Sequence, residues 1–238
     1  MSTLKERFYR DQDKLFDSLT DFCQQTLEKG CATKGQATFM VSGGATPAPL
    51  YQRLSRRVLS WSKINVALVD ERWVEPSSDS SNQAFIKKTL LQHNGADSRF
   101  IDLNLQLACY QADADAVNEA YQALPKPWDL TILGMGSDGH TASIFPNANG
   151  TEQSLDDSQD KLVTAIKARK TKVTGDNTKR ITLSKNGLLQ SQQIVLLITG
   201  QEKLNVYRRA LQQTNHNKMP ISALLQQTKV PIQVFWAP

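Results

Sequence analysis

Short apolar runs rich in β-branched residues recur along the chain, and longer segments with helical spacing separate them. An uninterrupted apolar run of this kind is typical of a strand that is buried on both faces, as in a parallel sheet. We therefore predict strands at residues 37–43, 64–70, 129–134, 161–166, 193–200 and 231–237.

The helical pattern is clearest before the first of these strands. Between residues 13 and 30 an apolar stripe follows helical spacing, and Gly30 is suited to end the helix. The same spacing predicts further helices, and alternation with the strands predicts an α/β fold with a mostly parallel, doubly wound sheet flanked by helices. The apolar stripe of the first helix consists of Leu15, Leu19, Phe22, Cys23 and Leu27. The further predicted helices are residues 46–55, 81–91, 112–124, 202–213 and 220–227. The polar segments 147–160 and 167–180 are expected to be surface loops.

Length and composition narrow the possible classes of protein. The 238 residues suit a single domain over 1–238. No apolar stretch approaches the roughly 18 residues of a membrane span, and the charged N-terminus differs from a secretory signal. Three scattered cysteines, Cys23, Cys31 and Cys109, have no metal-ligand spacing and suit the cytoplasm. The net charge of +5 is mixed with acidic residues, so we expect no nucleic-acid partner. We also expect no membrane partner, and we expect a monomer.

Three strand ends carry candidate chemistry, because open α/β sheets bind ligands at the carboxyl ends of their strands. The turn of Ser42, Gly43, Gly44 and Thr46 precedes a helix and predicts an anion site, although a plain tight turn has the same composition. The charged residues Asp70, Glu71 and Arg72 directly follow another strand. Lys203 lies in the first turn of a helix, where a cation is unfavourable unless an anion lies nearby. For residues 70–72 and for Lys203, the alternative is that the charged side chains are simply solvated at the surface.

A fourth strand end, "GMGSDGH" at 134–140, allows three interpretations. It matches G-x-G-x-x-G, but the acidic residue of a dinucleotide site should end the next strand, and the acids here precede it. A nucleophile elbow around Ser137 would need glycine where Met135 stands. The remaining interpretation is that the turn presents His140 as a general base or acid, with Asp138 as its orienting partner.

Six motifs occur in the order found in one family: "SGGATP", "VDERWV", "SNQAF", "GMGSDGHTASIFP", "RITLS" and "TGQEKLNVY". On these segments the chain resembles the 6-phosphogluconolactonases, which share a fold group with glucosamine-6-phosphate deaminases and ribose-5-phosphate isomerases. The resemblance implies hydrolysis of 6-phospho-D-glucono-1,5-lactone to 6-phosphogluconate without cofactor or metal. It implies that His140 activates water, that Asp138 assists, and that the phosphosugar lactone contacts Ser42, Gly43, Gly44, Thr46, Asp70, Arg72, Arg180 and Lys203.

One segment departs from the family pattern. Residues 170–179, "KTKVTGDNTK", replace the proline-rich segment that precedes "RITLS" in the family, which leaves the contact made by Arg180 open.

Two other functions stay under consideration. A deaminase of the fold group would carry glutamate five residues after the histidine, where this chain has Phe145. A non-catalytic sugar-phosphate-binding regulator would need a DNA-binding extension, for which 238 residues leave no obvious room.

Overall fold

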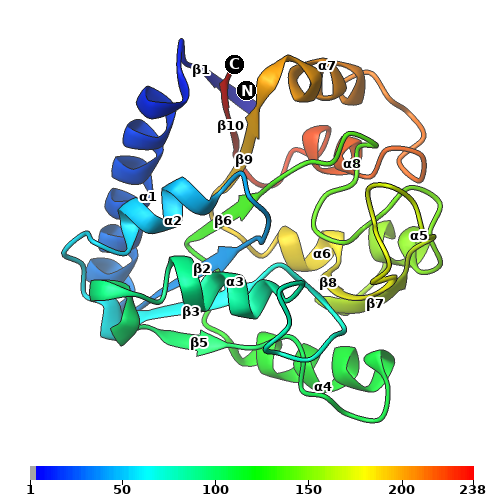
Figure 1. Ribbon diagram of the computed structural model, residues 1–238, viewed down its shortest axis with the longest axis horizontal. Helices are drawn as coiled ribbons and strands as arrows, with labels where there is room; N and C mark the ends of the chain where they lie inside the picture. Colours follow the sequence, from blue (N-terminus) through cyan, green and yellow to red (C-terminus); the bar gives the residue numbers. More distant parts are fainter. Residues whose placement is uncertain (1–3) are drawn as a thin grey trace.

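A seven-stranded parallel sheet forms the centre of the protein in the computed structural model, which describes residues 4–238 (Figure 1). Every neighbouring pair of strands in it is parallel. The predicted mostly parallel, helix-flanked sheet is therefore confirmed. In spatial order the strands are β1 (Leu4–Phe8), β10 (Ile232–Ala237), β9 (Ile194–Thr199), β6 (Leu130–Leu133), β2 (Ala37–Val41), β3 (Ile64–Leu68) and β5 (Arg99–Ile101).

A second, smaller sheet differs from the prediction. Its three strands, β4 (Asp70–Arg72), β8 (Lys179–Leu183) and β7 (Val163–Lys167), pair antiparallel in that order. The prediction of a parallel strand at 161–166 was therefore wrong in direction. Helix α4 (Tyr110–Ala123) covers β7 and β8, and Val163 and Ile166 of β7 are buried although the strand lies outside the central sheet. The end of the expected loop 167–180 also belongs to this sheet.

The first helix, α1 (Gln12–Lys34), begins and ends at clear signals. The side chain of Asp11 accepts a hydrogen bond from the backbone N–H of Lys14 at 2.8 Å, which caps the first turn. The helix ends at Gly35, which has the left-handed conformation with φ of 76°. The predicted stop at Gly30 was wrong. Gly30 is buried inside the helix, where a β-carbon would come 2.3 Å from Oδ1 of Asp129, so its small size permits close packing on the sheet.

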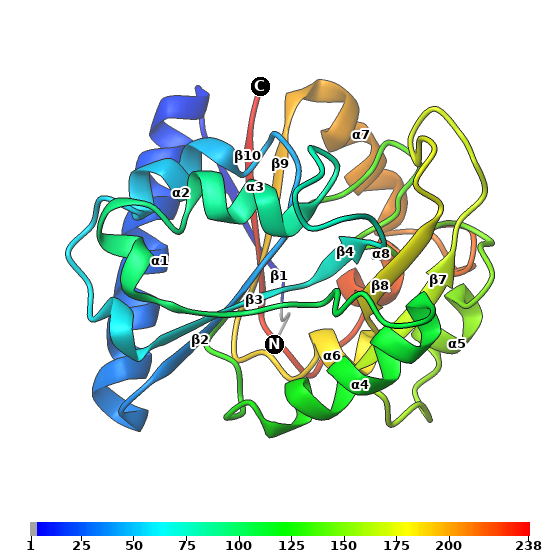
Figure 2. The same ribbon diagram turned by 60° about the horizontal axis from the view of Figure 1, so that its bottom comes forward.

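Helices cover both faces of the central sheet. Figure 1 and Figure 2 show α1 and α2 on one face and α7 and α8 on the other. The structure differs from the prediction in two further respects. The expected loop 147–160 contains a short helix, α5, and the strands β1 and β5 were not predicted from the sequence. The remaining helices are α2 (Ala48–Leu54), α3 (Asn82–Thr89), α5 (Thr151–Leu155), α6 (Lys185–Leu188), α7 (Gly200–Ala210) and α8 (Ile221–Leu225), with 3-10 turns η1 (Trp61–Lys63) and η2 (His93–Asp97).

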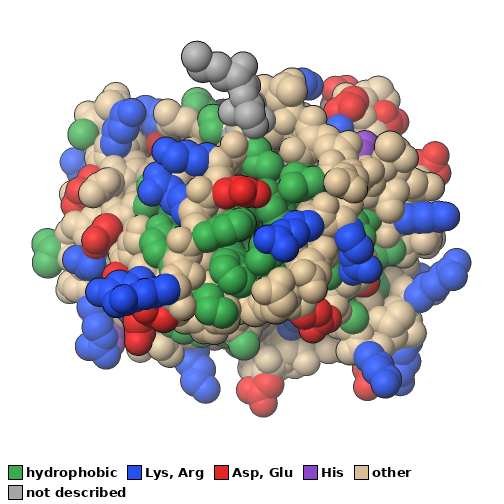
Figure 3. Space-filling model, turned by 90° about the horizontal axis from the view of Figure 1, so that it is seen from above, with side chains coloured by type: hydrophobic (Ala, Val, Ile, Leu, Met, Phe, Trp, Pro, Cys, Tyr) green, Lys and Arg blue, Asp and Glu red, His purple; other side chains and the backbone are tan. Residues whose placement is uncertain are grey.

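One edge of the central sheet is formed by β1. Figure 3 looks onto this side and shows apolar side chains gathered at its centre with charged groups around them. Phe8 is 46% exposed and lies edge-on against Trp236 of β10. The charged residues Lys5, Glu6 and Arg7 alternate in sign along the strand, a pattern that discourages further strands from pairing with an open edge.

The strand order fixes where a ligand can bind. Strands β2 and β6 are neighbours in the sheet. From β2 the chain continues to β3, on the side of β2 away from β6, whereas from β6 it continues to β9, on the side of β6 away from β2. This reversal is a topological switch point, and a crevice opens there beyond the carboxyl ends of the two strands. The loops that start at Ser42 and Gly134 both lie at this crevice.

Candidate active site

A cavity of about 300 Å³ lies at the switch point and brings together segments that are far apart in the sequence. Its walls come from the turn after β2, strands β4 and β8, the turn after β6, and the start of α7. Nine of the ten residues proposed from the sequence line it, and the tenth, Asp138, lies behind His140. The nine are Ser42, Gly43, Gly44, Thr46, Asp70, Arg72, His140, Arg180 and Lys203.

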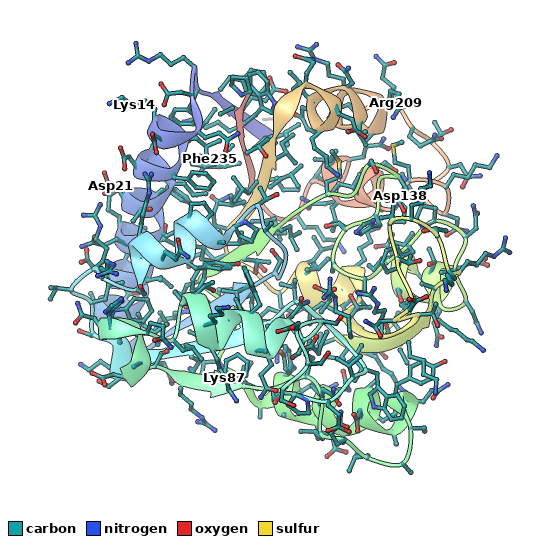
Figure 4. All side chains as sticks on the ribbon, viewed as in Figure 1. Lys14, Asp21, Lys87, Asp138, Arg209 and Phe235 are labelled. Carbon is teal, nitrogen blue, oxygen red and sulfur yellow. The ribbon has the colours of Figure 1, made fainter. Side chains whose placement is uncertain are left out.

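His140 and Asp138 form a closely bonded pair. Nδ1 of His140 lies 2.6 Å from Oδ1 of Asp138, and the same oxygen accepts the backbone N–H of His140 at 3.1 Å. Figure 4 labels Asp138 on the loop that follows β6. A proton on Nδ1 would be held by this carboxylate and would leave Nε2 free to accept a proton. Partial burial raises the pKa of Asp138, but the hydrogen bonds and charge of His140 outweigh it, so the pKa lies below its usual value.

Two arginines face each other across the small sheet. Arg72 of β4 and Arg180 of β8 are directly opposite in the antiparallel register, and both line the cavity. Arg180 is only 4% exposed, and burial together with the charge of Arg72 lowers the pKa of Arg180 to about 10. Nη1 of Arg72 donates to the carbonyl of Ser80, while its buried Nε has no hydrogen-bond partner among the described residues 4–238. Two like charges held this close are suited to a bound dianion.

The carboxylates beside Arg72 have different surroundings. Asp70 lines the cavity, accepts a hydrogen bond from the hydroxyl of Ser143, and lies 3.4 Å from Nδ2 of Asn82. Glu71 points away and accepts bonds from the start of α3, including the backbone N–H groups of Asn82 and Gln83 at 2.8 and 2.7 Å. Burial raises the pKa of Glu71 despite these bonds. Asp70 is therefore available to a ligand, whereas Glu71 fixes α3.

The turn after β2 approaches the cavity with its backbone. A β-carbon on Gly43 would come 2.0 Å from Oδ1 of Asn82, so a larger residue would displace the asparagine. The buried hydroxyl of Ser42 has no hydrogen-bond partner in residues 4–238. Helix α2 starts at Ala48, after Pro47, and within residues 4–238 no side chain caps its first turn.

Lys203 lies in the first turn of α7 and lines the same cavity. Partial burial lowers the pKa of Lys203, against the opposing charges of Glu202 and Asp138. The cavity is thus lined by three cationic side chains, Arg72 and Arg180 from the small sheet and Lys203 from α7.

Asn82 and Ser143 belong to the site but were not proposed from the sequence, and Phe145 was named there only as the residue that stands where a deaminase carries glutamate. Asn82 and Ser143 act through contacts with Asp70, and Phe145 packs its ring 4.4 Å from the imidazole of His140, between centroids. The motifs "SNQAF" and "HTASIFP" contain all three residues. The residue types of Asn82 and Ser143 alone carry no chemical signal, because asparagine and serine are common in helix caps and turns.

Within residues 4–238 no group of three or more His, Cys, Asp or Glu side chains is placed to hold a metal ion. The three cysteines are free thiols. No helix in the same part of the chain is both long and apolar enough to span a membrane.

Comparison with known proteins identifies the family. The model of the glucosamine-6-phosphate isomerases/6-phosphogluconolactonase family matches residues 10–236. The chain belongs to this family. It is similar to the 6-phosphogluconolactonase of Rhizobium meliloti, with 35% identity over 97% of both chains, and to that of Pseudomonas aeruginosa, with 35% identity over 89% of this chain and 86% of the relative.

Solved structures of similar proteins agree with this family assignment. A 6-phosphogluconolactonase from Shewanella baltica has a TM-score of 0.91 and 36% identity, covering 100% of this chain and 98% of its own. A monomeric glucosamine-6-phosphate deaminase, with a TM-score of 0.80 and 20% identity over 98% of this chain and 97% of its own, shows the shared fold alone. The predicted family, the fold class and the assignment to the 6-phosphogluconolactonase enzymes are confirmed.

Proposed function

We propose that this enzyme hydrolyses 6-phospho-D-glucono-1,5-lactone to 6-phosphogluconate and that His140 is the general base. The observation that carries this proposal is the bond of 2.6 Å between His140 and Asp138 at the wall of a cavity lined by Arg72 and Arg180. Asp138 holds the imidazole of His140 in one orientation, and the arginines of the same cavity are suited to bind the phosphate of the substrate. A deaminase has no comparable support, because the apolar ring of Phe145 packs on the imidazole.

The reaction needs one proton acceptor and one place for negative charge. Nε2 of His140 takes a proton from water as the water oxygen attacks C1 of the lactone, and the carbonyl oxygen becomes an oxyanion. The ring C–O bond then breaks, the carbonyl re-forms, and the leaving oxygen takes the proton from His140. General base catalysis of this kind contributes about 10²–10⁴-fold. A lactone is an activated ester, so we expect the enzyme to need neither a metal nor a cofactor.

The charges of the cavity orient the substrate. Arg72, Arg180 and Lys203 attract the phosphate, and the turn of Ser42, Gly43, Gly44 and Thr46 supplies backbone N–H groups and hydroxyls. Asp70 is placed to accept bonds from sugar hydroxyls. Anchoring the remote phosphate would hold C1 near His140 and lower the entropic cost of reaction.

Turnover of freshly prepared lactone, corrected for spontaneous hydrolysis, tests the proposal. We expect kcat/KM for the phosphorylated lactone to exceed that for plain D-glucono-1,5-lactone by at least about 10²-fold, because the phosphate's binding energy orients the carbonyl. Arg72→Ala and Lys203→Ala, measured separately, should then show which cation affects KM and which affects kcat. Equal turnover of the two lactones would refute the phosphate anchor. We further expect the enzyme to act as a single-domain monomer in the cytoplasm.

A further inference from the structure

The guanidinium of Arg180 is held by the loop that precedes it. Its Nε donates to the carbonyl of Asn177 at 2.7 Å, and its Nη2 donates to the carbonyl of Thr174 at 3.0 Å. The ring of Phe145 lies 5.3 Å from the guanidinium carbon. A long, flexible side chain is thereby fixed in one direction inside the cavity.

These two bonds occupy one edge of the guanidinium. The group is a planar fork with five N–H donors, and Nε and Nη2 share the edge that the loop carbonyls bind. Within residues 4–238 Nη1 donates to no acceptor. The end of the fork formed by Nη1 and Nη2 is therefore open for bidentate binding of an anion, the geometry that suits two phosphate oxygens.

The loop itself is braced by two threonine hydroxyls. Oγ1 of Thr174 donates to the carbonyl of Arg169 at 2.6 Å and accepts the backbone N–H of Thr171 at 2.8 Å. In return, Oγ1 of Thr171 accepts the N–H groups of Val173 and Thr174 at 3.2 and 3.1 Å. Thr174 is only 7% exposed, although its neighbours in the loop are exposed. Its hydroxyl braces the turn, and its carbonyl holds Arg180.

We propose that Thr174 is a positioning residue that sets the direction of the Arg180 fork for the substrate phosphate, with Thr171 supporting it. The inference rests on the proposed function and assigns a role to the segment between β7 and β8. Thr174 contacts no substrate; it acts through Arg180. The same turn brings Val173 to the rim of the cavity.

The test compares Thr174→Val, which keeps the branched shape but removes the hydroxyl, with Thr174→Ser, which keeps the hydroxyl. We expect Thr174→Val to raise KM for the lactone and Kd for 6-phosphogluconate by about tenfold, since a buried donor and acceptor lose their partner, with kcat changed less than about threefold. Thr174→Ser should restore both constants. Thr171→Val, at an exposed position, should give a smaller change in the same direction. Thr33→Val, at an exposed position near the end of α1 and the amino end of β2, should give none.

A double-mutant cycle separates this role from a general effect on folding. In an Arg180→Lys background, which lacks the fork, Thr174→Val should have no further effect on Kd. An equal tenfold loss in both backgrounds would overturn the inference. The Nε–H proton of Arg180 gives a readout that needs no ligand: its NMR signal should be protected from exchange in the wild type and in Thr174→Ser, and exchange faster in Thr174→Val. Unchanged protection would contradict the inference even if the enzyme proved inactive on the lactone.

Discussion

Gly136 and His140 lie so close together that a β-carbon on Gly136 would come 2.1 Å from Nδ1 of the imidazole. The same carbon would lie 2.4 Å from Oδ1 of Asp138, so it would intrude on both partners of the pair. The backbone N–H of Gly136 also donates to the carbonyl of His140 at 2.9 Å, which closes the turn. The absence of a side chain at residue 136 therefore makes room for the bond between the imidazole and its carboxylate.

Gly136→Ala should lower kcat by about 10²-fold, because the added methyl group forces His140 away from Asp138 and displaces the base. The matched control is Gly134→Ala in the same turn, where a β-carbon would meet nothing within 4 Å. Steady-state kinetics of both variants would check this. If the two substitutions lower kcat equally, crowding of the imidazole is not the cause.

His140→Ala should lower kcat by roughly 10²-fold or more, the usual contribution of a general base. The fold should persist, because the side chain hydrogen-bonds only to Asp138 within residues 4–238. Thermal unfolding measured beside turnover would separate the two effects. His93→Ala, at an exposed histidine of η2, is the control and should keep full activity. A folded His140→Ala enzyme with near-normal turnover would rule out this base.

The strand ends were predictable because the carboxyl ends of parallel strands meet at one edge of a sheet. Segments as far apart in the sequence as Ser42 and Lys203 could therefore be assigned to one site from the sequence, and both line the same cavity. The direction of β7 could not be predicted, since apolar character reports burial and says nothing of the neighbouring strand. The bond between Ser143 and Asp70, 73 positions apart, was equally hidden. Hydroxyls of this kind find their partners only in the folded chain.

Asp138→Asn should lower kcat at least tenfold, because an amide can donate to Nδ1 and so stabilise the tautomer that lacks a free base at Nε2. The Asp138 carboxylate should also make the free energy of unfolding depend on pH. The pKa of Asp138 in the fold lies below the usual 3.8, so its carboxylate stabilises the fold above that pH. This stabilisation is lost as the pH falls through the lower, folded-state pKa.

Urea unfolding of the wild type and of Asp138→Asn at several pH values measures this contribution. The difference in unfolding free energy should be largest near neutral pH and should shrink below about pH 4. A difference that stays constant down to strong acid would mean that the carboxylate's charge does not contribute.

Chelation should leave turnover unchanged, because the proposed reaction draws its base from His140 and its electrostatic stabilisation from Arg72, Arg180 and Lys203. We expect enzyme dialysed against EDTA to match untreated enzyme in kcat and KM. Recovery of lost activity by one divalent ion, and not by others, would reveal a metal requirement that this mechanism lacks.

The enzyme should release no ammonia from glucosamine 6-phosphate. The sequence resemblance places a glutamate of the deaminases where this chain has Phe145, and in the structure the Phe145 ring lies 4.4 Å from the His140 imidazole. An aromatic ring can neither accept a strong hydrogen bond from the imidazole nor carry negative charge, so Phe145 cannot supply the carboxylate that the deaminase pattern places beside the histidine. A coupled ammonia assay beside the lactonase assay, at equal enzyme concentration, should show hydrolysis alone. Ammonia release at a rate comparable to lactone hydrolysis would replace the proposed function with that of a deaminase.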